Sequence, residues 1–365
     1  MYLFLTAYLL LAIPSAAAVL RQKQTPVVAI AWLLAIVLLP IGGSLFYLLA
    51  GYRKPVRDVP PTDSRPAAGI ERMLWYGCST RVRYRNRVEQ LHDGGEAFAA
   101  LISALQGARR YIHLSYYIFA DDRIGHAIAD ILVRKAAQGV DVRLIYDDFG
   151  SLLGLPSDFV VKMERAHIRC IPFNPVVPLV SLVMNHRDHR KIVVVDGNTA
   201  YTGGINLADE YINEEERFGY WKDAALRTEG AAVWNFTVMF LKHWNAFRPS
   251  ETDYTPFAPR PEALPDRSDG VVQPYGDSPL DEEALAETVY LNIIHQAQRY
   301  VYIYTPYFAV GETMLEALKA AAKRGVDVRL VLPGIPDKKL VFELTRAHYE
   351  TLLRAGVRIY EYTPG

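Results

Sequence analysis

The stretch Gly139-Val-Asp-Val-Arg-Leu144 occurs again as Gly325-Val-Asp-Val-Arg-Leu330, with all six residues identical. Two flanking stretches repeat in the same order, because residues 110–119 match 299–308 and residues 168–171 match 357–360. The offsets are 189, 186 and 189 residues, so the two copies stay in step apart from one small deletion. Self-similarity at a fixed spacing indicates a duplicated structural unit.

Each copy has the pattern of an alternating α/β unit. In the first copy, apolar residues recur at helical spacing over 96–108 and again over 122–138. Apolar runs typical of strands lie at 111–119 and 140–146, and Gly139 takes the place of a glycine that ends a helix. In the second copy, Ser278-Pro279 is the expected start of a helix over 280–298. The pattern predicts two α/β lobes with parallel or mixed sheets flanked by helices, related by a pseudo-twofold axis, with a cleft between them.

Composition limits the classes of protein that remain. The 365 residues carry 40 basic and 40 acidic side chains, a balance that argues against a dedicated nucleic-acid-binding protein. Cys78 and Cys170 are the only cysteines, which excludes a disulfide scaffold and the multi-cysteine zinc folds. The charge is unevenly placed, since residues 1–50 contain only Arg21 and Lys23.

Residues 1–20 and 26–50 form two apolar runs separated by a short polar turn. Roughly 20 apolar residues span a bilayer as a helix, so residues 1–52 are predicted to form two transmembrane helices. Arg53, Lys54 and Arg57 follow the second run and favour a cytoplasmic body. A cleaved secretory signal ending near the small residues 15–18 and a buried soluble hairpin are the alternatives.

Proline-rich stretches divide the remainder of the chain. Residues 53–70 and 249–270 are predicted linkers. They delimit a first lobe at 71–248 and a second, partial lobe at 271–365. Arg81, Arg83, Arg85 and Arg87 alternate along a predicted strand, as either a solvated face or a surface for anionic lipid.

The residues that indicate chemistry lie in Asn185-His-Arg-Asp-His189-Arg-Lys191 and the stretch that follows it. Here His189-x-Lys191-x4-Asp196 is followed, after six residues, by Gly203-Gly204-x-Asn206. Strand alternation over 191–195 places His189 and Lys191 on one face. An imidazole can form a phosphohistidine, while a lysine and an asparagine can hold phosphate oxygens. A carboxylate such as Asp196 can orient a histidine, and the glycines permit close backbone approach.

This motif, its place inside a repeat, and the apolar head together resemble the phospholipase D superfamily, particularly its bacterial cardiolipin synthase branch. The stretches 116–119, 146–151, 209–211, 221–223, 240–244 and 305–308 are similar to that family as well. The resemblance implies catalytic roles for His189, Lys191 and Asp196 and phosphate binding by Asn206, with Gly203 and Gly204 beside it. Asp223 is a further candidate for polar substrate contacts. No metal or other cofactor is expected.

The implied reaction is transfer of a phosphatidyl group from one phosphatidylglycerol to another through a phosphohistidine, giving cardiolipin and glycerol. The resemblance implies a multi-pass protein of the bacterial inner membrane with a cytoplasmic body. Its implied partners are anionic phospholipids. A phospholipase D-type hydrolase and a membrane-bound, lipid-binding pseudoenzyme are the alternatives. Which histidine attacks and which oligomeric state occurs stay open.

One expected element is missing. Members of the superfamily carry the His-x-Lys-x4-Asp motif in each lobe, and of the nine histidines here only His189 has lysine two positions later. Extending the second copy as far as the first would need about 70 more residues. The sequence therefore predicts either a truncated two-lobe enzyme or a one-motif chain that pairs His189 across a homodimer. We expect catalysis by the 365-residue chain alone to be impaired.

Overall fold

The computed structural model describes residues 2–21, 26–48, 69–78, 80–176, 187–261, 264–265, 270–277 and 284–365. Three helices begin the chain, α1 (Tyr2–Arg21), α2 (Pro26–Leu38) and α3 (Pro40–Phe46), and they pack on one another around Val19, Ile36 and Tyr47. In the described part of the chain, no helix combines the length and the apolarity that a membrane crossing needs. The two transmembrane helices expected in residues 1–52 therefore stay a prediction.

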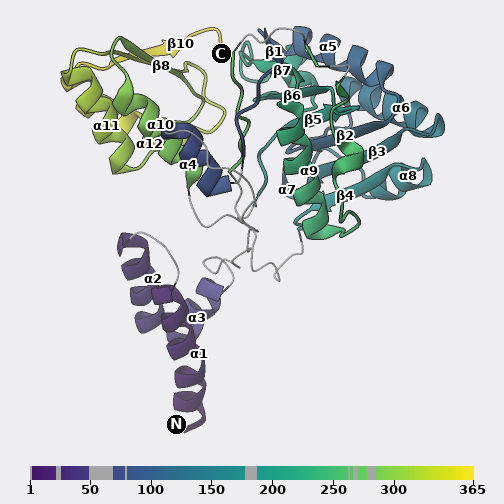
Figure 1. Cartoon of the computed structure of the whole chain (residues 1–365). Coiled ribbons are helices and arrows are strands. Elements are labelled where there is room, and N and C mark those ends of the chain that lie inside the picture. The colour runs from purple at the N-terminus through teal and green to yellow at the C-terminus, as the bar shows by residue number, and fades with distance from the viewer. Residues whose placement is uncertain are drawn as a thin grey trace.

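A seven-stranded mixed sheet forms the larger body of the chain (Figure 1). Its strand order is β1-β7-β6-β5-β2-β3-β4, in which β2, β3 and β4 run parallel and the other pairs are antiparallel. The strands are β1 (Asn86–Leu91), β2 (Tyr111–Tyr116), β3 (Asp141–Asp147), β4 (Arg169–Phe173), β5 (Ile192–Val195), β6 (Thr199–Gly203) and β7 (Ala225–Gly230). The predicted α/β class is confirmed, although β2 ends three residues earlier than the sequence pattern suggests.

Helices cover both faces of this sheet. One face packs against α5 (Gly94–Gly107), α6 (Arg123–Ala137) and α8 (Phe159–Arg165), which contribute residues such as Phe98, Ile128 and Phe159 to a large apolar core. The other face packs against α9 (Val233–Phe247), which buries Phe240 and Trp244. The short helix α7 (Asp148–Ser151) follows β3, and the 3₁₀ turns η2 (Asp209–Ile212) and η3 (Thr255–Phe257) lie in connections.

The second copy forms a smaller sheet of three parallel strands in the order β10-β9-β8. They are β8 (Tyr300–Tyr304), β9 (Asp327–Pro333) and β10 (Arg358–Tyr362), accompanied by α10 (Leu285–Gln296), α11 (Glu312–Lys323), α12 (Lys339–Ala347) and α13 (Tyr349–Arg354). These strands are the counterparts of β2, β3 and β4. The expected helix start at Ser278-Pro279 lies outside the described residues, and α4 (Gly69–Cys78) packs on α10 through Leu74 and Leu285.

The two sheets differ in what surrounds them. In the first, β5 pairs with the edge of β2 and α9 covers the face that holds Tyr111 and His113. In the second, among the described residues, β8 pairs only with β9, and the side chains of Tyr300 and Tyr302 are more than half exposed. The second unit therefore presents an open sheet edge and an open aromatic face.

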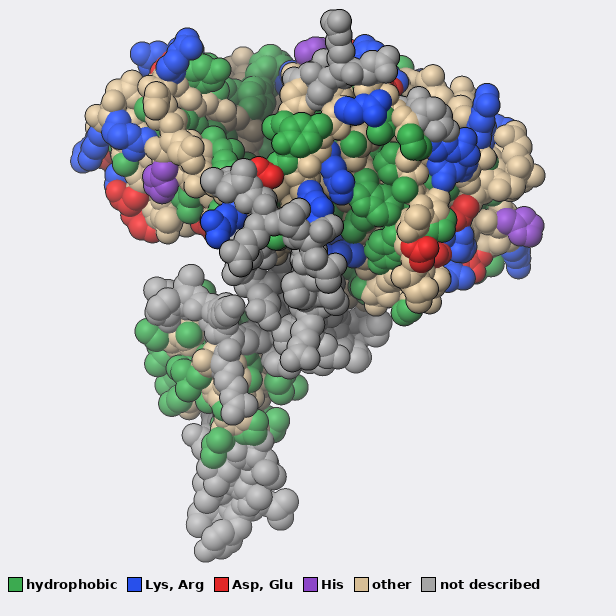
Figure 2. All heavy atoms as spheres, viewed as in Figure 1, with side chains coloured by type: hydrophobic (Ala, Val, Ile, Leu, Met, Phe, Trp, Pro, Cys, Tyr) green, Lys and Arg blue, Asp and Glu red, His purple; other side chains and the backbone are tan. Residues whose placement is uncertain are grey.

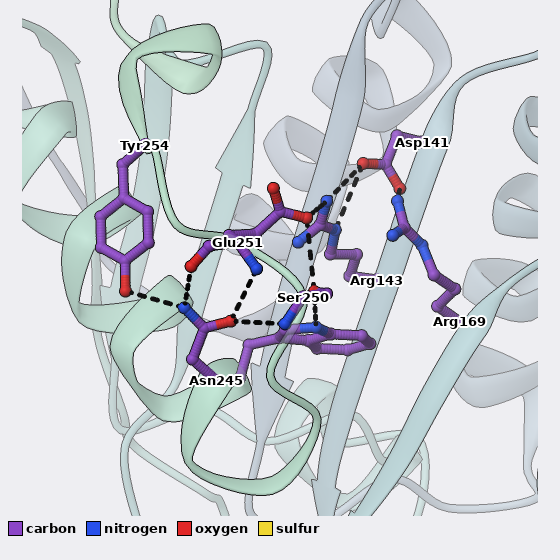
Figure 3. A network of polar contacts seen from close by, with 8 residues as sticks. Asp141, Arg143, Arg169, Asn245, Ser250, Glu251 and Tyr254 are labelled. Atoms are coloured by element: carbon purple, nitrogen blue, oxygen red, sulfur yellow. Dashed lines mark hydrogen bonds and ion pairs between the residues drawn. The ribbon is translucent and has the colours of Figure 1, made fainter.

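Arg143 on β3 shows how the covered face accommodates a charge. Its side chain is 2% exposed and binds Asp141 at 3.0 Å and Glu251 at 2.7 Å (Figure 3). Its guanidinium lies 4.9 Å from the ring of Phe257 and 5.5 Å from that of Trp244. A buried guanidinium needs such partners because desolvation without them is costly.

The four arginines at 81–87 do not form the expected alternating face. Strand β1 begins only at Asn86, and Arg85 has φ 60°, which breaks strand alternation. Arg83 donates to Asn235 at 2.9 Å, and Arg85 donates to the carbonyl oxygens of Leu264 and Pro265. Two of these arginines thus hold chain segments together.

Candidate active site

His189 and Lys191 lie just before β5 rather than on it, yet their side chains meet. Lys191 Nζ is 3.0 Å from His189 Nδ1 and donates to the His189 carbonyl oxygen at 2.8 Å. The His189 ring packs on the Tyr117 ring, with centroids 4.5 Å apart, and Lys191 Nζ lies 5.6 Å from the centre of the Tyr117 ring. The His189 side chain is only partly covered by protein whereas Lys191 is 4% exposed, so the lysine approaches the histidine from the protein interior.

The surroundings alter the acid–base properties of both residues. Partial burial and the nearby charges of Lys191 and Lys338 lower the pKa of His189 to about 4, while Asp188 opposes the shift. His189 is therefore neutral at physiological pH, as a nucleophile must be. Burial lowers the pKa of Lys191 to about 8, although Asp223 and Asp188 act in the opposite direction. Lys191 stays mostly cationic near pH 7.

Asp223 lies beside this pair because Gly204 has no side chain. A Cβ at Gly204 would meet Asp223 Oδ1 at 2.2 Å and Oδ2 at 2.6 Å. The carboxylate accepts from the amide of Ala224 at 2.7 Å. Gly203 has a different reason to be glycine, since a Cβ there would meet the carbonyl oxygen of Ala224 at 2.5 Å, where β6 meets the start of β7.

Asn206 holds the backbone next to Tyr117. Its Oδ1 accepts from the amide of Ile118 at 3.1 Å, and its Nδ2 donates to the hydroxyl of Tyr211 at 2.6 Å. Ser151 holds the same segment from the other side, because it donates to the Tyr117 carbonyl oxygen at 3.3 Å. The ring that packs on His189 is thus fixed by groups from α7 and from the loop after β6.

Asp196 lies at the opposite end of β5 from His189. Its carboxylate accepts from the amides of Arg109, Arg110 and Tyr111 at 2.7–3.0 Å. Since β5 runs antiparallel to β2, Asp196 lies where β2 begins, seven positions along the chain from His189. The structure therefore brings His189, Lys191, Gly204 and Asp223 together and places Asp196 at a backbone-anchoring site.

Sequence reasoning missed a buried charge cluster next to His189. Asp188 accepts from Arg190 Nε at 2.8 Å and pairs with Nδ1 of His243, on α9, at 3.0 Å. Burial by itself would raise the pKa of Asp188, but His243 and Arg190 hold it far below its ordinary range. The amide of Asp188 also donates to Asp147 at 3.3 Å, at the end of β3. The segment that carries His189 is therefore fixed on both sides.

The arrangement has the chemistry for phosphoryl transfer. It combines a neutral imidazole, a buried cation within contact distance and an aromatic wall. In the described residues, no group of three or more His, Cys, Asp or Glu side chains is placed to hold a metal ion.

Comparison with known proteins agrees with this geometry. The family described as "Cardiolipin synthase, PLD-like domain" matches residues 101–226 and 290–365, and the one described as "Phospholipase_D-nuclease N-terminal" matches residues 10–51. A solved structure of phosphatidylserine synthase from Haemophilus influenzae superposes with a TM-score of 0.53 at 17% identity, covering 76% of this chain and 73% of that one. The family match over more than half of the chain shows an enzyme of the phospholipase D class.

Curated relatives narrow the class. The chain is 36% identical to a cardiolipin synthase from Geobacillus thermodenitrificans and 33% identical to one from Halalkalibacterium halodurans, in each case over 94% of this chain and 73% of the relative. It is 39% identical to an uncharacterized protein from Streptococcus mutans, over 92% of this chain and 78% of that one. The chain belongs to the cardiolipin synthase family of phosphatidyltransferase enzymes.

Proposed function

We propose that the protein transfers a phosphatidyl group from one phosphatidylglycerol to the glycerol hydroxyl of another, giving cardiolipin and glycerol. The observation that carries the proposal is the contact between a neutral histidine and a buried cationic lysine, 3.0 Å apart, in a chain of this family. His189 is the candidate nucleophile or general acid–base, and Lys191 the candidate ligand of the phosphoryl oxygens. Asn206 anchors the backbone next to Tyr117, and the charge of Asp223 favours the cationic form of Lys191.

The steps balance as two displacements at phosphorus. If His189 is the attacking residue, its Nε2 forms a P–N bond, and the P–O bond to glycerol breaks as a general acid gives the leaving oxygen its proton. The hydroxyl of the second phosphatidylglycerol then loses its proton to the same group and displaces the histidine. An ammonium only donates, so contact with Lys191 leaves the ring proton on Nε2. When a bound phosphate draws the lysine away, this proton moves to Nδ1, and the free lone pair of Nε2 can attack phosphorus.

The general acid is proposed to be a second histidine that belongs to a second copy of the His-x-Lys pair. The open edge of β8 supports this, because in the first copy β5, which follows His189 and Lys191, occupies the equivalent edge of β2. A strand with its own His-x-Lys pair fits there by the symmetry of the repeat.

We also propose that residues 1–50 attach the protein to the bacterial inner membrane, with the body cytoplasmic. The described parts of the N-terminal helices expose large apolar side chains, including Ile30, Leu34 and Leu38 at 54–74%, and Figure 2 draws no charged side chain among them. A contiguous apolar surface of this kind is typical of a lipid contact. A cysteine at Gln22 should react with an impermeant maleimide from the periplasmic side, and reaction only from the cytoplasmic side would contradict the hairpin.

The test of function is conversion of labelled phosphatidylglycerol by a chain extended through a second motif. We expect cardiolipin and glycerol in equal amounts, and no cardiolipin after His189→Ala. Phosphatidic acid in place of cardiolipin would identify a hydrolase instead. Full conversion by the 365-residue chain alone would contradict the need for a second histidine.

A further inference from the structure

We propose that Lys338 and Tyr307, both from the second copy, bind the phosphate of the acceptor phospholipid, the group that carries the attacking hydroxyl but does not itself react. The site rests on the proposed transfer reaction and adds to it the element that recognises the second substrate. Its ligand class is an anionic phosphodiester with a short polyol head.

The two side chains form a surface cluster together with the carboxylate of Asp337. Lys338 Nζ lies 2.9 Å from the Tyr307 hydroxyl and 4.5 Å from the centre of its ring. The Tyr307 hydroxyl also binds Asp337, whose carboxylate is 3.8 Å from Lys338 Nζ. The Lys338 side chain is 61% exposed, so its position is set by Tyr307 while its ammonium still faces solvent. A surface ion pair with that exposure contributes little to stability.

The position of Lys338 in the fold directs it toward the first copy. Tyr307 follows β8 and Lys338 follows β9, so both come from the carboxyl edge of a parallel sheet, where α/β proteins bind ligands. In the first copy the same edge of β2 supplies Tyr117, which packs on His189. By the symmetry of the repeat, Tyr307 and Lys338 lie at the edge of the second sheet that corresponds to the edge carrying Tyr117 in the first.

Direct contacts join the two copies near these residues. The amide of Tyr220, in the first copy, donates to the Pro364 carbonyl oxygen at 2.6 Å. Gly219 lies so close to the second copy that a Cβ there would meet Ile335 Cδ1 at 3.0 Å. Lys338 follows Ile335 by three residues, and its charge is one of those that lower the pKa of His189, after burial and Lys191.

The proposed reaction brings two anionic phosphates together, so it calls for a second cation besides Lys191. Lys191 contacts His189 directly and so serves the phosphate that is being transferred. The phosphate of the acceptor is separated from its attacking hydroxyl by a three-carbon glycerol, so it lies outside that contact. Without a second cation, two anionic phosphates would repel each other in one cleft. Lys338 supplies this charge from the second copy.

The experiment measures binding by the full 365-residue chain, so it does not depend on turnover. Dihexanoylphosphatidylglycerol, a soluble probe, is titrated calorimetrically into the unaltered protein, into Lys338→Gln and into Lys191→Gln. The control is Lys339→Gln, since the neighbouring lysine is equally accessible but has no part in the site. We expect two sites in the unaltered protein and in Lys339→Gln, with one site weakened about tenfold or more in Lys338→Gln and the other in Lys191→Gln.

A second readout tests the placement of Lys338 directly. The charges acting on His189 are Lys191 and Asp188 from its own segment and Lys338 from the other copy. Removing the Lys338 charge should therefore raise the pKa of His189, measured as the pH dependence of its modification by diethylpyrocarbonate, and Lys339→Gln should leave it unchanged. Unchanged binding and an unchanged His189 titration in Lys338→Gln would overturn the site. The absence of any Lys338-dependent site in the unaltered protein would also overturn the inference, whereas the absence of only the Lys191-dependent site would refute the role of Lys191 in the proposed function.

Discussion

Gly204→Ala is expected to act through a single neighbour, the carboxylate of Asp223. The three atoms nearest to an added Cβ all belong to Asp223, at 2.2, 2.6 and 2.8 Å. A carbon atom normally keeps about 3.5 Å from such neighbours, so the carboxylate must withdraw by about 1 Å. Gly204 is not among the glycines with positive φ, and its backbone therefore accepts alanine.

The magnitude follows from this overlap. Overpacking of this kind costs about 1–3 kcal/mol of unfolding free energy, which corresponds to a fall in Tm of about 2–10 °C for a domain of this size. Asp223 raises the pKa of Lys191, so moving its charge away should lower that pKa further below about 8. The neutral fraction of Lys191 at pH 7.5 then increases, which NMR of ¹³C-methylated lysines detects.

A double substitution separates this account from a general loss of packing. In the Asp223→Ala background the obstructing carboxylate is gone, so Gly204→Ala should be neutral or stabilise slightly, by about 0.5 kcal/mol, through the less flexible unfolded chain. The assay is thermal unfolding of the four proteins of the cycle. An equal loss of stability from Gly204→Ala in both backgrounds would refute the reasoning.

Three further substitutions test groups that the chemistry does not use directly. Asp196→Ala should cost about 3 kcal/mol by thermal unfolding, because three backbone amides lose their acceptor, and Asp196→Asn should cost less. Burial, with Arg143 and Arg169 nearby, holds the pKa of His113 well below 6.5, so its contribution to stability is full above that pH and is lost as the pH falls. His113→Phe should remove about 1.4 kcal/mol of the stability difference between pH 8 and pH 5.5, and an unchanged difference would contradict this account. His243→Ala leaves Asp188 buried with one partner fewer and should cost about 3 kcal/mol, while a loss under 1 kcal/mol would contradict the role of the cluster.

The sequence predicted the sheet well where local pattern and repeat agreed. The apolar runs around Ile112 and Val142 became β2 and β3, and the helix between them starts at the cap formed by Asp122. The pairing of His189 with Lys191 was also predicted, although for a different reason: the two residues precede β5, and their contact depends on the loop conformation rather than on strand alternation.

Other parts of the site depend on contacts distant in sequence and had no local signal. Asp196 has the spacing of a catalytic carboxylate, but antiparallel pairing of β5 with β2 carries it to the far end of the sheet. The Asp188–His243 pair joins residues that are 55 positions apart and belong to different elements, so no spacing rule predicts this contact. Arg85 adopts a positive φ that its residue type rarely takes, so strand alternation fails at that point.

The repeat itself separates what local sequence determines from what tertiary packing adds. Asp141 and Arg143 on β3 correspond to Asp327 and Arg329 on β9, and both arginines bind the aspartate two residues before them, at 3.0 and 2.6 Å. Yet Arg143 is 2% exposed and Arg329 38% exposed. The difference lies in the cover that α9 and its following loop, with Glu251, place over the first sheet. An ion pair that contributes little in solvent becomes part of a core only when such a cover closes over it. Among the described residues, the exposed face of the second sheet has no such cover.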